Sequence, residues 1–369
     1  MDKRYWVGFN LVKGIGAVRF RALCDHFGDL SLAWQAPADA LLAAGLGAKL
    51  VEKVIQIRAT MDLEKIMSRI LAQGIQILTW EDEGYPRRLK EIDQPPPVLY
   101  VRGKLTPEDT WAVAVVGTRR VSAYGRQVAE ELAAFLAHNG ITVVSGLARG
   151  VDSIAHNAAL QVGGRTIAVL GSGVDRIYPP EHAQLAEKTI ASGALLSDYA
   201  PGTPPDALNF PPRNRIISGI SMATVVVEAG DTSGALITAQ FAIDQGREVF
   251  AVPGTIYAPQ SKGTNRLIAQ GAHPLLSMQD ILNVLNLRRV TEQAEVRRVL
   301  PGNEIEEKLM SVLTHEPLLM DEIRIKTGLP IERVSATLVM MELKGLVRQV
   351  GGMNYVAVRD EQADYKVNV

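Results

Sequence analysis

The sequence predicts an α/β protein with a mostly parallel sheet that is covered by helices on both faces. Between residues 112 and 276, short β-branched runs recur, and each passes directly into a turn rich in glycine, serine and arginine. A helical pattern follows most of these turns. Continuously apolar strands that alternate with helices are typical of a parallel sheet buried on both sides. In such a sheet the turns after the strands line one crevice, where ligands bind.

Four strands of this kind are expected in the central region. They cover residues 112–116, 141–144, 166–170 and 223–227, and their turns begin at Gly117, Ser145, Gly171 and Glu228. The first turn leads into a helix, because the apolar residues 128, 132, 135 and 136 share one helical face. Asp152 is placed to cap a second helix over 153–161. A third helix over 233–246 leads into a further strand at 248–252.

Composition narrows the class of protein. A chain of 369 residues is too long for one ordinary core, so we expect about two to four domains. The content of 47% hydrophobic and 21% charged residues is typical of a folded chain. The single cysteine, Cys24, excludes an internal disulfide, and the six histidines are scattered, so neither a metal nor a cofactor is expected.

Charge and hydropathy narrow the class of protein further. The formal net charge is −1, so any site for a polyanion must be a local patch on a nearly neutral body. The N-terminus lacks the apolar run of a signal peptide, and no stretch approaches the length of a membrane span. A cytoplasmic protein without a membrane span is the expectation.

Residues 1–75 are predicted to form a domain of short helices. Within it, 12–17 and 44–49 each place an apolar residue between two glycines, ahead of a helical pattern. This arrangement resembles a pair of helix-hairpin-helix motifs in a SAM-like domain. The turn amides of such motifs can hold a DNA phosphate, because glycine lets N–H groups at a helix N-terminus approach an anion. Two tight helix connections in a small packing module are the alternative.

The rest of the chain divides into three predicted parts. Residues 76–111 are expected to add a strand or two to the main sheet, so the central domain spans 76–285. Residues 286–303 carry mixed charges and are predicted to be a solvated linker, with a basic tail that grips nucleic acid as the alternative. Residues 304–369 contain three helical patterns and a hairpin turning on Gly351-Gly352, which resembles a winged helix. Its third helix is not clearly basic, so contact with a protein is favoured over reading of DNA.

Arginine is concentrated in the predicted turns. Arg119, Arg120 and Arg126 lie in or beside the first turn, Arg149 lies in the second, and Arg213 and Arg215 lie in a later turn, 209–215. This clustering predicts a localised anion site, because the planar guanidinium fork suits phosphate oxygens. Hydroxyl donors can come from Ser122, Ser145, Ser172 and Ser233. The alternative is that the arginines pair structurally with Asp152, Asp198 or Glu228.

Neither common nucleotide-binding signature is present. Gly171-Ser-Gly173 does not continue into the Gly-x-Gly-x-x-Gly pattern of a dinucleotide site. Lys262-Gly-Thr264 lacks the spacing and the preceding strand of a P-loop. Phe210 and Tyr178 lie beside the basic turns, so a base could stack there while phosphates meet arginine. Core or rim packing is the plainer interpretation of either ring alone.

Five long motifs, in this order, carry a family resemblance. They are Val115 to Arg120, Ser145 to His156, Gly171 to Pro180, Phe210 to Gly219 and Glu228 to Ala235. Together they resemble the DNA-processing protein A (DprA/Smf) family. The resemblance implies an extended Rossmann-like domain that binds single-stranded DNA without cutting it. It also implies a homodimer through that domain, loading of the RecA recombinase, and protection of incoming DNA during natural transformation.

The turns and the resemblance together predict the site. The candidates for contact with DNA are Gly117, Thr118, Arg119, Arg120, Ser122, Ser145, Gly146, Arg149, Gly150, Gly171, Ser172, Gly173, Phe210, Arg213, Asn214, Arg215, Ser233 and Gly234. Arg119 or Arg120 is the leading phosphate contact. Some family members carry a DNA-binding lysine after the Tyr-Pro of the third turn, where this chain has Pro180, Glu181 and His182. That contact is therefore not counted among the predicted ones.

Two other classes of protein stay open. The segment from Glu228 to Gly234 is similar to part of the motif of nucleotide phosphoribohydrolases, but residues 235–243 contain no acid to act as its second glutamate. Asp152 and His156 could form another acid–base pair, although a helix cap and a core histidine are the simpler interpretation. A protein-interaction scaffold with structural arginines is the third class. We predict a protein without catalytic residues.

Overall fold

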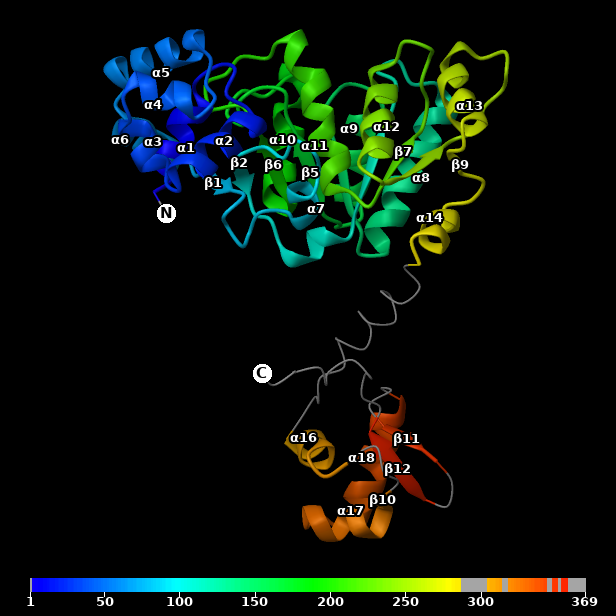
Figure 1. The fold of residues 1–369 in the computed structure, drawn as a ribbon. Coiled ribbons are helices and arrows are strands. Elements are labelled where there is room, and N and C mark those ends of the chain that lie inside the picture. The colour runs from blue at the N-terminus through cyan, green and yellow to red at the C-terminus, as the bar shows by residue number, and fades with distance from the viewer. Residues whose placement is uncertain (1, 287–303, 314–317, 344–346, 351–352, 358–369) are drawn as a thin grey trace. The chain divides into compact units, whose positions relative to one another are not determined.

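The computed structural model describes residues 2–286, 304–313, 318–343, 347–350 and 353–357 (Figure 1). These residues belong to two compact units, 1–285 and 286–369. The segment predicted to be a linker, 286–303, lies outside the described residues except for Asn286.

The first part of the larger unit is helical, as predicted. Its helices are α1 (Lys3–Asn10), α2 (Ala17–Phe27), α3 (Leu30–Gln35), α4 (Ala38–Ala43), α5 (Ala48–Thr60) and α6 (Leu63–Ala72). The two predicted hairpins precede α2 and α5, whose N-terminal caps are Gly16 and Gly47. The hairpins also meet, since Lys53 Nζ of α5 donates to the Lys13 carbonyl at 3.4 Å. Contact of these turns with DNA stays a prediction.

An aromatic cluster joins these helices to the edge of the sheet. Trp6 stacks on Phe20 with ring centroids 5.6 Å apart, and its edge meets Trp80 at 5.5 Å. Trp80 directly follows the first strand of the sheet, and Tyr100 of the second strand donates to Asn10 Oδ1 at 2.9 Å. The boundary predicted at residue 75 therefore lies inside one compact unit with a shared core.

A nine-stranded sheet forms the centre of this unit, in the order β1-β2-β6-β5-β4-β3-β7-β8-β9. The strands are β1 (Gln76–Thr79), β2 (Val98–Gly103), β3 (Ala112–Val116), β4 (Thr142–Ser145), β5 (Thr166–Val169), β6 (Ala194–Ser197), β7 (Ala223–Val226), β8 (Glu248–Ala251) and β9 (His273–Pro274). Strand β2 pairs antiparallel with both β1 and β6. In the sheet order, every neighbouring pair from β6 through β5, β4, β3, β7 and β8 to β9 is parallel. The mostly parallel sheet is therefore confirmed.

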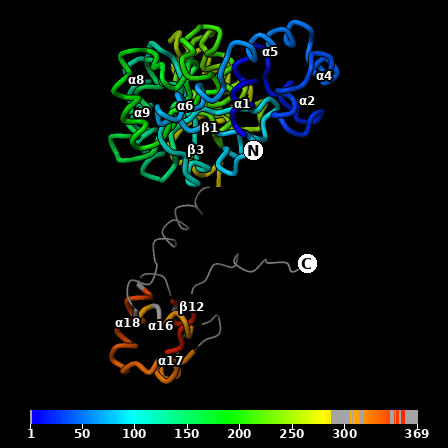
Figure 2. The backbone as a smooth tube through the Cα atoms, turned by 90° about the vertical axis from the view of Figure 1, so that its left-hand side faces the viewer, coloured from blue at the N-terminus to red at the C-terminus, as the bar shows by residue number. Residues whose placement is uncertain are grey.

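Helices cover both faces of the sheet. They are α7 (Arg87–Lys90), α8 (Ala123–His138), α9 (Val151–Gln161), α10 (Ala183–Ser192), α11 (Phe210–Ile220), α12 (Gly234–Asp244), α13 (Lys262–Ala269) and α14 (Gln279–Val284). Short 3₁₀ helices cover Pro107–Thr110, Pro180–His182, Ala207–Asn209 and Pro259–Ser261. Helices α7, α11 and α12 share one core with alternate strand residues, whereas α8 and α9 lie on the opposite face (Figures 1 and 2).

Two local predictions were wrong. The segment 209–215 is not a turn, because Phe210 begins α11 and the two following prolines suit the first turn of a helix. Asp152 does not cap the next helix either. That helix starts at Val151, and Asp152 Oδ2 instead accepts from the amides of Gly146 and Ala148, at 3.0 and 3.3 Å.

His156 is a fully buried histidine on α9. The Thr166 hydroxyl donates to the Val143 carbonyl, so His156 Nδ1, at 2.6 Å, must donate its proton to Thr166 Oγ1. Its Nε2 is then unprotonated and has no hydrogen-bond partner. Burial, together with the charges of His182 and Arg213, lowers the pKa of His156 to about 3. The ring is therefore neutral in the folded protein.

We expect this neutral ring to make the protein acid-sensitive. Below pH 6.5 the unfolded histidine gains a proton that the folded one cannot accept until about pH 3. Stability should fall as pH drops through this window, by about 1.4 kcal/mol per pH unit at full slope, and level off above it. Urea unfolding of wild type and His156→Gln at about pH 7.5 and about pH 5 measures how much the free energy of unfolding of each protein changes with pH. These two pH values lie on either side of the upper end of the window. Equal pH slopes would remove His156 as the cause.

The smaller unit has the predicted three helices and hairpin. Its elements are α16 (Glu304–Met310), β10 (Leu318–Leu319), α17 (Met320–Thr327), α18 (Ile331–Leu343), β11 (Val347–Gln349) and β12 (Asn354–Ala357). Strands β11 and β12 pair antiparallel, and β10 pairs with the other side of β12. Leu309, Ile323 and Leu338 are fully buried between the helices. The turn predicted at Gly351-Gly352 lies outside the described residues.

Candidate functional site

The sheet changes its direction of growth at β3, which has β4 on one side and β7 on the other. In open parallel sheets, ligands bind at such a switch point, beyond the carboxyl ends of the strands. A cavity of about 700 Å³ opens there. Its walls include residues 117–120 after β3 and residues 232–235 at the start of α12, together with Phe210 of α11. We call this cavity the crevice.

Glu228, two residues after β7, positions the loop that follows β3. Its carboxylate accepts from the Ser122 amide at 2.9 Å and from the Ser122 hydroxyl at 2.5 Å. Its own carbonyl accepts from the Thr118 amide at 2.7 Å. Ser122 Oγ also accepts from the Gly125 amide and so caps α8. These hydrogen bonds fix the conformation of the loop after β3. Among the described residues, Glu228 forms no ion pair with an arginine.

The leading candidates, Arg119 and Arg120, are exposed on this loop. Both line the crevice, and no carboxylate pairs with either in the part of the chain that the structure describes. The Arg119 guanidinium carbon lies 5.7 Å from the centroid of the Phe210 ring. The rings of Phe210 and Tyr178 are 5.8 Å apart and line the same wall. Among the described residues, Arg119 therefore lies beside an aromatic ring without an ion-pair partner, and Arg120 lines the same cavity without one. Of the two rings, Tyr178 is 37% exposed.

Arg213 also borders the crevice, but its guanidinium is buried and bonded within the protein. Its Nη1 donates to the carbonyls of Gly146, at 2.9 Å, and Val169. Burial lowers the pKa of Arg213 to about 10, while the charge of Asp152 opposes that change. Burial likewise raises the pKa of Asp152, and the charge of Arg213 opposes it. From α11, Arg213 therefore links the loop after β4 to the last residue of β5.

Gly150 brings the second loop against the first. It has a φ of +80°, and a Cβ at this position would lie 2.3 Å from the Thr118 carbonyl oxygen. The Val151 amide donates to the same oxygen at 3.3 Å. This close approach of two turns explains why glycine stands here.

Substitution of Gly150 should therefore cost more than its backbone conformation alone explains. Gly163 is a matched control, because it has a φ of +73° and no atom within 4 Å of a Cβ. We expect Gly163→Ala to cost about 1–2 kcal/mol, the usual cost of the left-handed conformation, and Gly150→Ala clearly more. Urea unfolding of both variants provides the measurement. Equal losses of stability would mean that the close approach of the two loops adds nothing.

The start of α12 forms the facing wall. Ser233 caps this helix by accepting from the Ala235 amide at 3.3 Å, and a Cβ on Gly234 would meet nothing within 4 Å. The buried Asn214 Nδ2 donates to the Gly234 carbonyl at 3.3 Å. The open backbone at Gly234 leaves room for a phosphate near a helix N-terminus.

The remaining candidates do not offer free groups to the crevice. The hydroxyls of Ser145 and Ser172 are buried and donate to the carbonyls of Val115 and Arg176. Arg149 pairs with Glu181 at 2.5 Å, and Arg215 pairs with Asp198 at 2.7 Å and donates to the Gln94 carbonyl. The glycines Gly171 and Gly173 are buried, with Gly171 against the Phe210 ring. Arg149 also lies beside the aromatic wall, in a small cavity that Tyr178 and Phe210 line as well.

Several lining residues were not predicted. Pro205, Ala207, Gly230, Thr232 and Ile237 reach the crevice from segments without arginine. Thr232 is polar and directly precedes the cap of α12, which is a signal that the sequence contains. The others have no chemical signature of their own, because their place depends on how α11 and α12 pack.

The described residues contain neither a membrane-spanning helix nor a metal-binding group of side chains. None of their helices is both long and apolar enough to cross a membrane. No three or more of their histidine, cysteine, aspartate and glutamate side chains gather in a group that could hold a metal ion.

These features define a Rossmann-like α/β protein whose switch-point crevice carries unpaired arginines within the described residues. The model of the DNA recombination-mediator protein A family matches residues 76–286, and that of the DprA winged helix domain matches residues 294–353. The chain belongs to this family, DprA/Smf.

Three known proteins illustrate the relationship. Protein Smf of Synechocystis is 37% identical, over 96% of this chain and 98% of the relative. The crystal structure of DNA processing protein A from Streptococcus pneumoniae has a TM-score of 0.68 at 34% identity, covering 76% of this chain and 97% of that one. A structure of DNA processing protein A from Helicobacter pylori, described for its single-stranded DNA binding mode, has a TM-score of 0.52 at 32% identity and covers 57% of this chain and 95% of that one.

Proposed function

We propose that this protein binds single-stranded DNA in the crevice and does not cut it. The observation that carries the proposal is the pair Arg119 and Arg120, which have no carboxylate partner in the described residues and line one cavity with Phe210 and Tyr178. Guanidinium groups can pair with phosphates while a base stacks on the exposed Tyr178 ring beside the half-buried Phe210. The structure of the H. pylori relative, described for its binding of single-stranded DNA, supports the same use of this fold.

The carboxylates of the crevice support a binding role over catalysis. Asp152 is the one carboxylate that lines the cavity within the described chain, and it accepts from the Gly146 and Ala148 amides. Glu228 is engaged by Ser122. Neither is free to serve as the acid or base that hydrolysis of a glycosidic or phosphodiester bond needs. These contacts also weaken the nucleotide phosphoribohydrolase alternative.

The wider role that we infer follows the family. The protein would act in the cytoplasm, protect incoming single strands during natural transformation and load the RecA recombinase onto them. We also infer a homodimer through the Rossmann-like domain. Large apolar side chains exposed after β8 and β9 support self-association, namely Ile256, Tyr257 and Leu276, which are 73%, 87% and 78% exposed.

Fluorescence anisotropy of a labelled oligo-dT across a salt series tests the binding proposal. We expect tight binding that weakens with salt, with a slope of about 0.7 for each phosphate contact. A duplex of equal length should bind less tightly, and the oligonucleotide should be recovered at full length. Failure to bind, or shortened products, would contradict the proposal.

A further inference from the structure

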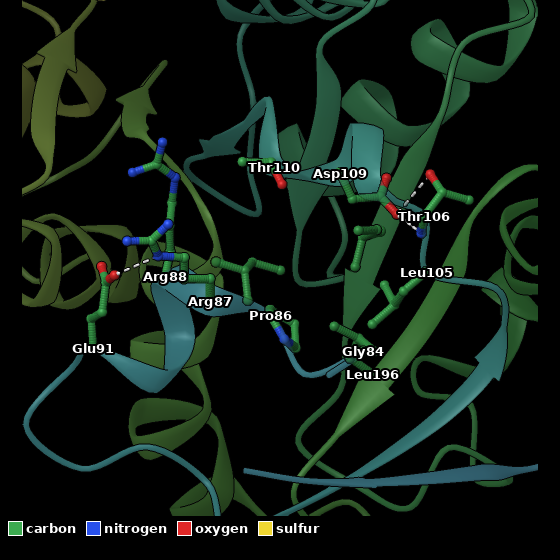
Figure 3. Close-up of a pocket in the computed structure, with 12 residues that line it drawn as sticks. Gly84, Pro86, Arg87, Arg88, Glu91, Leu105, Thr106, Asp109, Thr110 and Leu196 are labelled. Carbon is green, nitrogen blue, oxygen red and sulfur yellow. Dashed lines mark hydrogen bonds and ion pairs between the residues drawn. The ribbon is translucent and has the colours of Figure 1, made fainter. Parts of the chain in front are cut away.

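A second cavity lies at the other ends of the strands, away from the crevice (Figure 3). It has a volume of about 290 Å³. Its lining includes the segment before β3, the start of α7 and the apolar residues Ile167, Leu196 and Ile220. Ile167 is the second residue of β5, and Ile220 is the last residue of α11. The cavity therefore opens at the amino ends of the parallel strands.

One wall of this cavity is cationic. It carries Arg87 and Arg88 of α7, with Glu91 as the nearby carboxylate (Figure 3). Arg87 Nε lies 3.3 Å from Glu91 Oε1, so this guanidinium is paired, although its side chain is 92% exposed. Arg88 has no ion pair among the residues described, and its Nε is buried without a hydrogen-bond partner. One positive charge at the cavity is thus left without a counter-charge.

A further guanidinium behind this wall adds to the imbalance. Arg247 Nη2 donates to the Arg88 carbonyl at 2.8 Å, its Nε is also buried without a partner, and no carboxylate within the described ranges forms an ion pair with it. Burial lowers the pKa of Arg247, the charge of Arg88 lowers it further, and the charge of Glu91 opposes both. Two neighbouring cations therefore share a region with one carboxylate, Glu91, that Arg87 already engages.

The opposite wall offers polar groups without a free negative charge. Asp109 accepts from Arg165 at 2.8 and 3.0 Å and from the Thr142 hydroxyl at 2.8 Å. The Thr106 amide donates to the same carboxylate at 2.8 Å. With its oxygens engaged, Asp109 would not repel an anion strongly. The Thr106 and Thr110 side chains add hydroxyl groups at this wall.

We propose that this cavity binds a small organic anion with a flat apolar body. Its carboxylate or phosphate group pairs with Arg88, and its body lies against Ile167, Leu196 and Ile220. Arginine binds such groups through charge-assisted hydrogen bonds, and a cation next to an apolar floor favours a ligand that carries both features. The volume suits a single ring with one charged group, since ligand sites for drug-sized molecules begin at about 300 Å³. This site is independent of the crevice and of DNA binding.

Fluorine NMR with the full chain tests the proposal, with 4-(trifluoromethyl)benzoate as the probe and its uncharged benzamide as the matched control. We expect saturable binding of the benzoate and much weaker binding of the amide. Arg88→Gln should weaken benzoate binding roughly tenfold. Lys90→Gln is the matched control, because Lys90 is an exposed cation of the same helix that does not line the cavity, and it should change benzoate binding by less than about twofold. Gly84→Leu should abolish benzoate binding, because its side chain can enter the cavity. A Cβ at Gly84 would have one neighbouring atom within 4 Å, Leu78 Cδ2 at 3.8 Å, so the substitution fits the backbone there.

Thermal melts of each variant establish that it is folded. If Gly84→Leu does not fold, the comparison of Arg88→Gln with Lys90→Gln still tests the proposal. The proposal is overturned if wild type shows no saturable binding, or if the amide binds as tightly as the benzoate. It is also overturned if Arg88→Gln binds like wild type. Displacement of the probe by oligo-dT would place it in the crevice and would likewise overturn the proposal.

Discussion

The double variant Arg119→Ala/Arg120→Ala should bind single-stranded DNA roughly 100-fold more weakly than wild type at low salt, because two charge-assisted hydrogen bonds of about 1.5 kcal/mol each disappear. Its thermal stability should stay close to that of wild type, since both side chains are exposed and form no ion pair in the described structure. The salt slope of binding should flatten by about 1.4, because each of the two phosphate contacts accounts for about 0.7. Anisotropy with oligo-dT across a salt series measures both quantities.

Arg126→Ala is the matched control for this variant. Arg126 lies in the first turn of α8, soon after the same loop, and is exposed, but it lies 3.9 Å from Glu130 and does not line the crevice. Its removal should leave the affinity for single-stranded DNA and the salt slope of binding nearly unchanged. If Arg126→Ala weakens binding as much as the double variant, the interaction depends on general surface charge and not on the crevice.

Arg213→Ala should instead destabilise the fold. The substitution removes the donor to the Gly146 and Val169 carbonyls and leaves the buried Asp152 without its nearest cationic neighbour. Removing one member of a buried charged network costs about 3–5 kcal/mol. For a unit of this size that corresponds to a fall in melting temperature of roughly 10 °C.

The comparison with Arg119→Ala makes this prediction specific. Both guanidinium carbons lie 5.7 Å from the Phe210 ring, so contact with that ring does not distinguish them. Scanning calorimetry should show a large shift for Arg213→Ala and almost none for Arg119→Ala. A stable Arg213→Ala protein that fails to bind DNA would mean that Arg213 contacts the ligand directly.

The sequence predicted the sheet well because its strands are β-branched and end in abrupt turns. The strands β3, β4, β5, β7 and β8 agree with their predicted ranges to within one residue at each end. Strand β6 was missed, since Ala194-Leu-Leu-Ser197 contains no β-branched residue and follows a helix closely. Strand β9 has two residues and no pattern of its own.

The site was harder to predict than the fold. Spacing along the chain identified the turns but not the direction of each side chain. Arg215 turns toward Asp198, and Arg213 turns into the interior, because helix periodicity on α11 separates neighbouring arginines. Glu228 illustrates the converse. A lone acid at the end of an apolar strand is visible in the sequence, but its bonds to Ser122 require the fold.

Photocrosslinking tests the central claim most directly. Oligo-dT carrying 5-iododeoxyuridine is irradiated with the full chain, and the crosslinked peptides are identified by mass spectrometry. Bases that stack in the crevice should crosslink to Tyr178 or Phe210, and these adducts should disappear in the Arg119→Ala/Arg120→Ala variant. Crosslinks confined to α2 and α5, or to α18, with none at Tyr178 or Phe210, would contradict binding in the crevice and would assign the DNA to one of the flanking parts.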